Sequence, residues 1–455
     1  MEKNDFYDFD IIDFGNSFEG IAKKDGMVVF IPGGIIGEKL QGKIIKKNKD
    51  YCIAKIEKIY SKSEYRIEEP ICDVYKRCGG CSALHIDYSM QLLEKKKMVQ
   101  NVLKKQGLDT SIVENTVGMG IPYYYRNKVQ YPIRLDEKGN TRIGFYAKRS
   151  HEIIENDCCY IQDRVIDNLS KEIFNILVKN GFKGYNEKEK KGDIRHLLIR
   201  RGYHTGQIMV VIVLNSKNVM EISKFKAVIN EITKLKDIKC IFANVNTKNT
   251  NEILGEYDVK LYGEDYISDY IGDFKYYISP KSFFQVNTIQ AEVLYSILKE
   301  KLNLKNTETL FDLYSGVGSI GIFLSNNVDK VYGIEIEKQA VKMANLNIKL
   351  NNVKNAEYIA GSVEDKIVEF EKRNINPDVI VVDPPRRGLD EKSIDYILKF
   401  SPKKIGYVSC NPATLARDLK LLSVKYDIIS ISPVDMFPNT EHVECVAVLE
   451  VKQDI

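Results

Sequence analysis

The sequence has no apolar run long enough to span a bilayer, which argues against a membrane-embedded protein. It also lacks a low-complexity tail and an obvious long-period repeat. Residues 1–5 are polar and acidic, so we expect no signal peptide and a cytoplasmic location. Charge of one sign is not in large excess, because the net charge is +4 and the pI is near 8.3. This mild basicity permits an RNA partner without requiring one.

What is present indicates a globular chain of several domains. The 455 residues exceed one ordinary core, so two or three domains are expected. Hydrophobic residues make up 44% and charged residues 29%, as in soluble globular proteins. Nine cysteines in such a chain indicate free thiols, a metal site or catalysis rather than disulfides.

Residues 1–60 have the pattern of a small, OB-like β-barrel. Strand-like runs at 9–14 and 27–31 alternate with glycines that are typical of turns. Such barrels often bind nucleic acid through basic loops, and the alternative is a barrel that only caps the protein. The lysines available for this role are Lys23, Lys24, Lys39, Lys43, Lys46, Lys47 and Lys49.

Cys72, Cys78 and Cys81 form a C-x5-C-x2-C run on a glycine-bearing loop. Three thiols this close indicate one metal centre, although iron–sulfur and zinc sites usually take four thiolates. The fourth must come from elsewhere, and Cys158 and Cys159 are the only later pair. A reduced loop without metal is the alternative.

The middle of the chain, residues 61–275, mixes strand and helix patterns and is predicted to be an α+β domain that holds these cysteines. A helix is predicted over 88–107, packed on the C-terminal domain, with its charged run 94–97 facing solvent. A basic and aromatic pattern then spans 123–146. Rings interleaved with cations suit unstacked RNA bases and phosphates, but the same residues also fill ordinary sheet faces.

Residues 276–455 are predicted to form a Rossmann-like α/β domain with a doubly wound parallel sheet. The last two strands lack a full helix between them, so the last can return antiparallel. Ligands of such sheets bind at the carboxyl ends of the parallel strands. The predicted strands are 309–314, 330–336, 356–360, 378–383, 404–410, 426–432 and 444–451.

The first of these strands contains Asp312 and leads into a glycine loop with Gly316 and Gly318. Glycines there let the backbone approach a nucleotide-like ligand, although this pattern alone also occurs in NAD-binding enzymes. The second strand ends near Glu335, whose carboxylate can hold two ribose hydroxyls of NAD or of S-adenosylmethionine. The sequence therefore predicts a nucleotide-type cofactor at this edge.

Cys410 follows a strand and is predicted to precede a helix. Asn411 suits the N-cap of that helix, and Pro412 suits its first position. The positive end of the helix dipole would favour the thiolate of Cys410, which makes it a candidate nucleophile. A buried structural cysteine is the alternative.

Two acids are predicted to reach the same edge as this cysteine. Asp383 begins an Asp-Pro-Pro-Arg run in which Arg386 replaces the aromatic residue of nucleic-acid amine methyltransferases, which argues against amine methylation. Asp383 then remains as a hydrogen-bonding group near cofactor and base. Glu444 starts the last strand and lies at this edge if that strand is antiparallel; Glu441 and His442 are rivals for the same role.

A cysteine, a carboxylate and a sulfonium cofactor suffice to methylate carbon 5 of uracil. Attack by a thiolate on carbon 6 makes carbon 5 nucleophilic. Carbon 5 takes the methyl group, and a base then removes its proton so that the thiolate is expelled. The target base must leave the RNA stack to reach these groups.

On these motifs the chain resembles the RNA uracil-5-methyltransferase family over essentially its whole length, and in particular the 23S rRNA branch. The resemblance implies a class I methyltransferase domain, an N-terminal TRAM barrel and a [4Fe–4S] cluster. It implies cluster ligands at Cys72, Cys78, Cys81 and, by the sequence that follows it, Cys159 rather than Cys158. It also implies Cys410 as nucleophile, Glu444 as base, and S-adenosylmethionine contacts at Gln285, Tyr314, Glu335 and Asp383.

The predicted function is therefore S-adenosylmethionine-dependent methylation of carbon 5 of a uridine in 23S rRNA, by a monomer. The same reaction on tRNA is one alternative, although the tRNA branch typically lacks the barrel and the cluster cysteines. A non-catalytic RNA-binding or RNA-remodelling protein is another, against which the intact Cys410, Asp383 and Glu444 argue. An NAD-dependent oxidoreductase would leave Cys410 and the Asp-Pro-Pro run unexplained.

Overall fold

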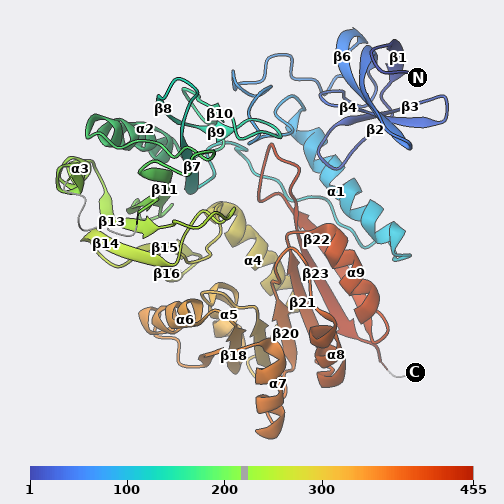
Figure 1. Cartoon of the computed structure of the whole chain (residues 1–455). Helices are drawn as coiled ribbons and strands as arrows, with labels where there is room; N and C mark the ends of the chain where they lie inside the picture. Colours follow the sequence, from blue (N-terminus) through green and yellow to red (C-terminus); the bar gives the residue numbers. More distant parts are fainter. Residues whose placement is uncertain (217–223, 454–455) are drawn as a thin grey trace.

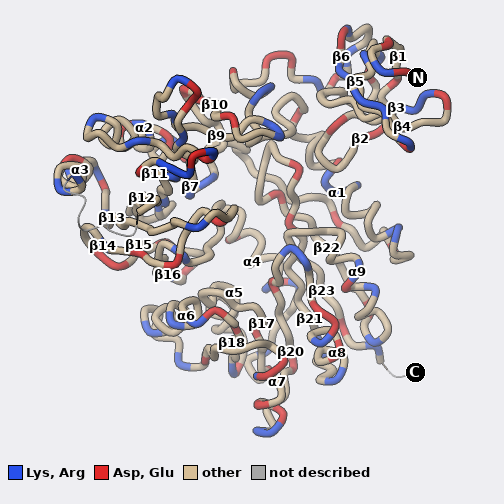
Figure 2. The backbone as a smooth tube through the Cα atoms, viewed as in Figure 1, with Lys and Arg blue, Asp and Glu red and all other residues tan. Residues whose placement is uncertain are grey.

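The computed structural model describes residues 1–216 and 224–453. Its three large sheets follow one another along the chain and are accompanied by two short hairpins (Figure 1). No helix in these two ranges is long and apolar enough to cross a membrane. Lys and Arg are interspersed with Asp and Glu over all three sheets, so charge alone does not single out one of them (Figure 2).

The N-terminal sheet has six strands in the order β1-β5-β6-β4-β3-β2. Neighbours are antiparallel except β4 and β6, which are parallel. Phe9, Val29 and Ile44 lie in its apolar core. The sheet covers the segment predicted as a small barrel, and its assignment to the TRAM type stays a prediction. The strands are β1 (Phe6–Asp10), β2 (Asp13–Phe14), β3 (Gly20–Lys24), β4 (Met27–Ile31), β5 (Lys39–Lys47) and β6 (Tyr51–Ser61).

The central sheet has the order β14-β13-β12-β11-β7-β8. Both of its faces are covered, which is why β12 is apolar and buried at every position. Helices α2 and α3 pack on one face, and α4 with the β15–β16 hairpin packs on the other. The elements are β7 (Lys128–Leu135), β8 (Thr141–Ile143), β9 (Phe145–Tyr146), β10 (Ile153–Ile154), α2 (Arg164–Lys179), β11 (Ile194–Arg201), β12 (Ile208–Leu214), α3 (Lys224–Ile232), β13 (Ile238–Val245), β14 (Tyr257–Gly263), β15 (Ile267–Ile271) and β16 (Phe274–Ile278).

The C-terminal sheet has seven strands in the order β19-β18-β17-β20-β21-β23-β22. The first five are parallel, with α4, α5 and α6 on one face and α7, α8 and α9 on the other. β23 is antiparallel to both neighbours, because residues 435–443 are too few for a crossover to a parallel strand. The elements are α4 (Thr288–Leu302), β17 (Thr309–Leu313), α5 (Ser319–Leu324), η2 (Ser325–Asn327), β18 (Lys330–Glu335), α6 (Lys338–Leu350), β19 (Ala356–Ala360), α7 (Val363–Lys372), β20 (Val379–Val382), α8 (Glu391–Phe400), β21 (Lys404–Ser409), α9 (Pro412–Leu422), β22 (Tyr426–Val434) and β23 (Glu444–Val451).

The register of this sheet brings several strand ends to one edge. Leu313 pairs with Val382, and Val382 pairs with Tyr407, so β17, β20 and β21 end side by side. Ser409 pairs with Cys445, so β23 starts where β21 ends. The predicted parallel sheet with an antiparallel last strand is confirmed.

Helix α1 (Tyr88–Lys105) packs against the C-terminal domain, beside α9 and β22 (Figure 1). Its Val99 and Leu103 enter the same core as the C-terminal sheet. The predicted solvent-facing charged run is wrong for Glu94 and Lys95, which are 6% and 0% exposed. Lys95 Nζ lies 2.6 Å from Asp435 Oδ1, and this partner makes the burial of the ammonium tolerable.

The basic and aromatic stretch 123–146 is also less exposed than an RNA surface requires. Tyr125, Tyr131 and Arg134 are 3%, 3% and 8% exposed. Tyr131 packs in the core with α2, where its hydroxyl donates to Asp167 Oδ1 at 3.0 Å. Arg134 donates to the Arg195 carbonyl at 2.6 Å, and Tyr125 packs in an apolar cluster with Cys159. For Tyr125, Tyr131 and Arg134 the prediction of direct contact with RNA was wrong, because these side chains are packed in the interior of the protein.

Candidate active site

The turn after β21 presents Cys410 at the carboxyl edge of the sheet. The side chain of Asn411 caps α9 by accepting a hydrogen bond from the Ala413 amide at 3.1 Å, and Pro412 is the first helical residue. Asn411 Nδ2 also donates to the Arg386 carbonyl at 2.9 Å, which ties this turn to the loop after β20. The predicted cap is confirmed.

The surroundings of Cys410 favour the neutral thiol over the thiolate. Burial and the charges of Glu444 and Asp383 raise its pKa to about 11, and the Arg386 guanidinium opposes them only in part. The expected contribution of the helix dipole toward the thiolate is outweighed here by desolvation and the two acids. Neutralising either acid would lower the pKa of the thiol.

Glu444 stands beside Cys410 because β23 runs antiparallel to β21. The pairing of Ser409 with Cys445 places Glu444 next to the residue that follows β21. Glu444 is 5% exposed, and burial together with the charge of Asp383 raises its pKa to about 8. Burial raises the pKa of Asp383 to about 7. The charge of Asp383 therefore acts on Glu444, and both acids have raised pKa values close to neutral pH.

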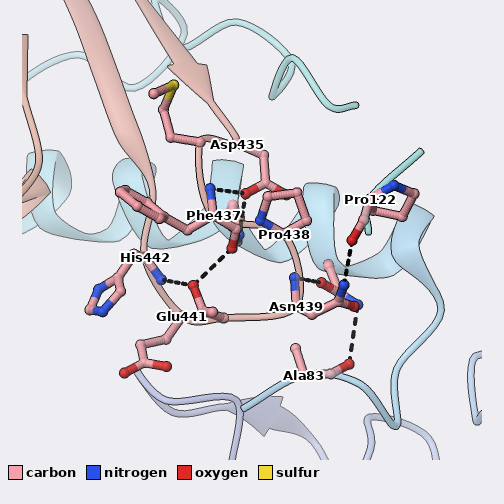
Figure 3. Close-up of polar contacts among 12 residues, drawn as sticks. Ala83, Pro122, Asp435, Phe437, Pro438, Asn439, Glu441 and His442 are labelled. Carbon is pink, nitrogen blue, oxygen red and sulfur yellow. Dashed lines mark hydrogen bonds and ion pairs between the residues drawn. The ribbon is translucent and has the colours of Figure 1, made fainter. Parts of the chain in front are cut away.

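Glu441 and His442, the other two candidates for the base, contact other residues. Glu441 Oε2 accepts a hydrogen bond from Ser82 Oγ at 2.6 Å. The ring of His442 lies edge-on to Phe437 with centroids 5.9 Å apart, and burial lowers its pKa (Figure 3). Of the three candidates, Glu444 is the one whose charge acts on the nucleophile.

The turn after β17 has the backbone of a ligand-binding loop. Gly316 and Gly318 have φ values of 54° and 80°, in the left-handed region that suits glycine. Glu335 Oε2 accepts a hydrogen bond from the Gly316 amide at 3.0 Å, which joins the ends of β17 and β18. Tyr314 also has a left-handed φ of 61°, and its hydroxyl lies 2.9 Å from Ser393 Oγ. Such backbone strain is typical of functional loops.

Asp312 and Tyr358 shape the floor of this loop. Asp312 Oδ2 accepts a hydrogen bond from the Gly321 amide at 3.0 Å, whereas Oδ1 is buried without a partner among the described residues. Burial raises the pKa of Asp312 to about 7. The Tyr358 ring fills the space beside Gly333, where a Cβ would lie 2.0 Å from a ring atom. The sequence reasoning missed Tyr358, although its register opposite Gly333 on paired strands explains why a glycine is needed there.

The segment that contains Gln285 links the central and C-terminal domains. Arg200 of β11 donates to the Ser282 carbonyl at 2.9 Å, and Asn127 Nδ2 donates to the Gln285 carbonyl at 3.1 Å. Gln285 is 7% exposed. The central sheet thus fixes the segment predicted to contact the cofactor.

The four predicted cluster ligands line one cavity of about 70 Å³. Cys72, Cys78, Cys81 and Cys159 contribute to its wall together with Arg126. Burial raises the pKa of both Cys81 and Cys159. The neighbouring thiol at position 158 lines an open groove beside this cavity.

The four thiols do not form a site for a single metal ion. Within residues 1–216 and 224–453, no three His, Cys, Asp or Glu side chains come close enough to hold one metal ion. In a four-iron cluster each thiolate binds a different iron, so the sulfurs stand farther apart than around one ion. Four thiols around one cavity, with a cation in its wall, are therefore compatible with an anionic iron–sulfur cluster.

Comparison with known proteins agrees with this geometry. The sequence model of the tRNA (Uracil-5-)-methyltransferase family matches residues 87–452. An uncharacterized RNA methyltransferase of Clostridium acetobutylicum is 46% identical over 99% of this chain and 98% of its own. One of Bacillus cereus is 43% identical over 99% and 98%.

Among solved structures, the Pyrococcus abyssi tRNA (uracil-54, C5)-methyltransferase in complex with S-adenosyl-L-homocysteine superposes with a TM-score of 0.77. The two chains are 28% identical, and the match covers 97% of this chain and 99% of the other. The similarity therefore extends over all three sheets, including the N-terminal one that precedes the family match.

Proposed function

Because the chain belongs to the tRNA (Uracil-5-)-methyltransferase family and is an RNA methyltransferase, we propose that it methylates carbon 5 of a uridine in 23S rRNA with S-adenosylmethionine as donor. The observation that carries the proposal is the meeting of Cys410, Glu444 and Asp383 at one sheet edge. Each of these side chains comes from the end or start of a different strand, as expected for a site at the switch between strands.

S-adenosylmethionine, when bound, supplies an electrophilic methyl group. The carboxylate of Glu335 suits the ribose hydroxyls, since it ends the second strand of the sheet beside the glycine loop. Asp383 lies between this loop and Cys410, near both cofactor and base. The proposed cofactor-binding residues are Gln285, Asp312, Tyr314, Gly316, Gly318, Glu335 and Asp383.

The nucleophile is Cys410. Its thiol proton passes to the carboxylate pair, and the sulfur bonds to carbon 6 of uracil, which turns the ring into an enolate. The transferred proton neutralises one of the two carboxylates that raise the pKa of the thiol, so the transfer itself lowers the pKa of the thiol.

Glu444 is the base that takes the proton from carbon 5 after methylation. The sulfur of Cys410 then leaves carbon 6, and the aromatic ring of the base is restored. A carboxylate whose pKa lies near 8 is a stronger base than an exposed glutamate and still ionises near neutral pH. The guanidinium of Arg386 lowers the pKa of the Cys410 thiol and of the Glu444 carboxyl, so it stabilises the thiolate and the carboxylate.

The cavity of the cysteines supports the proposal of a [4Fe–4S] cluster held by Cys72, Cys78, Cys81 and Cys159. Such a cluster would supply structural cross-linking between the segment before α1 and the segment before α2. Methyl transfer itself moves no electrons between centres, so a structural role suits this reaction.

Two observations bear on the RNA substrate. The rRNA proposal rests on the cysteine set, which the chain shares with the 23S rRNA branch it resembles. The N-terminal sheet does not separate the two RNAs, because the similarity to a tRNA methyltransferase structure includes it. The similar Pyrococcus abyssi structure, a tRNA methyltransferase, favours tRNA as a second candidate. The geometry of the site suits a uridine of either RNA.

Nucleoside mass spectrometry tests both candidate RNA substrates, rRNA and tRNA. Anaerobically purified protein is given methyl-labelled S-adenosylmethionine with separate, unmodified rRNA and tRNA pools. Labelled 5-methyluridine in rRNA alone is the expected result. Label in tRNA alone would refute the proposed rRNA substrate and support the proposed methylation of carbon 5. No label in either pool would refute the proposed function.

A further inference from the structure

The loop that joins β22 to β23, residues 435–443, is called here the base loop because Glu444 follows it directly. Figure 3 shows it beside labelled residues of two remote segments, Ala83 and Pro122. We propose that residues 82–91, which follow the third cysteine, position the base loop through Asn439, and so hold Glu444 in place for proton removal. The proposal rests on the proposed function, because it concerns the step assigned to Glu444.

Asn439 is bonded through every polar atom to residues outside its loop. Its carbonyl accepts hydrogen bonds from the amides of Ser82 and Ala83, both at 3.1 Å. Its amide donates to Gln91 Oε1 at 3.0 Å, and its Oδ1 accepts from Gln91 Nε2 at 3.2 Å. Its Nδ2 donates to the Pro122 carbonyl at 2.7 Å. Asn439 is only 2% exposed, so water does not replace these bonds readily.

Helix α1 fixes the start of the same loop. Asp435 is fully buried, with Oδ1 on Lys95 at 2.6 Å and Oδ2 accepting from the Tyr88 hydroxyl at 3.0 Å. Lys95 Nζ also donates to the Phe437 carbonyl at 3.2 Å. The loop is therefore held at its first residue by the helix and at its middle by the segment before the helix.

The wall of the cysteine cavity touches the base loop as well. Ser82 comes directly after Cys81 in the chain. Arg126, which lines the cavity, lies over the ring of Phe437 at 5.8 Å. Tyr125 packs in the same apolar cluster as Cys81 and donates its hydroxyl to the Pro438 carbonyl at 2.9 Å. Three separate contacts thus connect the cysteine cavity with the segment that leads to the base.

The nucleophile is held by different elements. Cys410 sits between β21 and α9, and its turn is tied to Arg386 on the loop after β20. The pairing of Ser409 with Cys445 links the two strands, but the base loop leads directly into Glu444 and not into the turn of Cys410. A disturbance at Asn439 should therefore act on the side chain of Glu444 more than on Cys410. Addition to carbon 6 and methyl transfer should continue, whereas removal of the carbon 5 proton should slow.

Asn439→Gly tests this separation. The φ of Asn439 is 66°, so glycine keeps the backbone conformation and the carbonyl bonds and removes only the side-chain bonds to Gln91 and Pro122. We expect about a tenfold slower release of methylated RNA, which corresponds to about 1.4 kcal/mol, and a covalent protein–RNA adduct that accumulates on a denaturing gel. Asn374→Gly is the matched control, because Asn374 is exposed with a φ of 53° in the turn after α7.

Hydrogen–deuterium exchange of full-length, anaerobically purified protein gives a readout that does not depend on activity. Exchange in a peptide covering 435–443 should increase in Asn439→Gly and in Cys81→Ser, while a peptide covering 330–350 stays unchanged. Gln91→Met removes the side-chain hydrogen bonds between Gln91 and Asn439 and keeps the length of the side chain. This variant replaces Cys81→Ser in the experiment if Cys81→Ser fails to fold.

The outcomes are distinguishable. Faster exchange of the loop together with adduct accumulation supports the proposal. Unchanged exchange in 435–443, or slow turnover without any adduct, overturns it, because the latter pattern indicates general loss of structure. If wild-type protein methylates no uridine while loop exchange still responds to Asn439→Gly, the proposed function fails and the positioning contact stands.

Discussion

Replacing Lys95 with methionine should destabilise the protein strongly, although it removes a single charge from a helix. Lys95 and Asp435 are both 0% exposed and their charged atoms lie 2.6 Å apart. Removing the ammonium leaves a fully buried carboxylate without its cation, and breaking a buried pair in this way costs about 3–5 kcal/mol. Asp435 keeps two donors, the Tyr88 hydroxyl at 3.0 Å and the Phe437 amide at 3.2 Å, so we expect a loss near the lower limit of that range.

Urea unfolding followed by far-ultraviolet circular dichroism measures this loss. Lys39→Met is the matched control, because Lys39 pairs with Asp10 at 3.9 Å while both side chains are 71% exposed, and such pairs contribute about 0–1 kcal/mol. The double variant Lys95→Met with Asp435→Leu removes both charges and should be more stable than Lys95→Met alone. If Lys95→Met unfolds at the same urea concentration as Lys39→Met, the argument from a buried charge is refuted.

Five further predictions follow from the site and the sheet that carries it. Cys410→Ala should abolish incorporation of labelled methyl groups while RNA binding in a filter assay is retained; turnover by this variant would refute the covalent route. Glu444→Gln should accumulate a covalent RNA adduct on denaturing gels, and failure to trap one would place the base elsewhere. The carboxylate form of Glu444 is the base and its pKa is about 8, so the single-turnover rate of wild type should rise with pH up to that value; a flat profile would contradict this. Burial also raises the folded-state pKa of Glu444 above its unfolded value of about 4.3. The stabilisation that this shift contributes is complete below about pH 4.3 and is lost as the pH rises through about 8. The urea midpoint of the wild type should therefore fall across this pH window more than that of Glu444→Gln. Gly333→Ala should destabilise the fold by about 1–3 kcal/mol, because a Cβ at this position lies 2.0 Å from the Tyr358 ring. Gly120→Ala is the control, because a Cβ at position 120 meets no atom within 4 Å. Equal thermal midpoints of the two variants would contradict the predicted clash.

Local signals in the sequence predicted much of the C-terminal domain. The bounds of β19 and β23 agree with the predicted runs residue by residue, and Asn411 and Pro412 occupy the expected cap positions. Strand patterns and helix caps depend on residues close in sequence, so a single chain shows them. The antiparallel direction of β23 also followed from the short connection before it.

Features that depend on distant partners were not predictable in this way. The burial of Lys95 depends on a carboxylate 340 residues later in the chain. Arg134 and Tyr131 were placed on an RNA surface because the sequence does not show their partners, which are the Arg195 carbonyl for Arg134 and Asp167 of α2 for Tyr131. The pKa of Cys410 was expected to fall because the helix dipole is local, whereas Glu444 and Asp383, which raise it, come from two other strands.

The packing of α1 against α9 and β22 has a consequence for synthesis of the chain. The helix is complete about 300 residues before α9 begins, which at about 5–20 residues per second leaves it without its partner for roughly 15–60 seconds. During that time Val99, Leu103 and the ammonium of Lys95 lack the surface that covers them in the native protein. A fragment that starts at residue 276 would have the opposite defect, with α9 and β22 uncovered. The surface that α9 and β22 present to α1 is therefore completed by a helix made in the first quarter of translation.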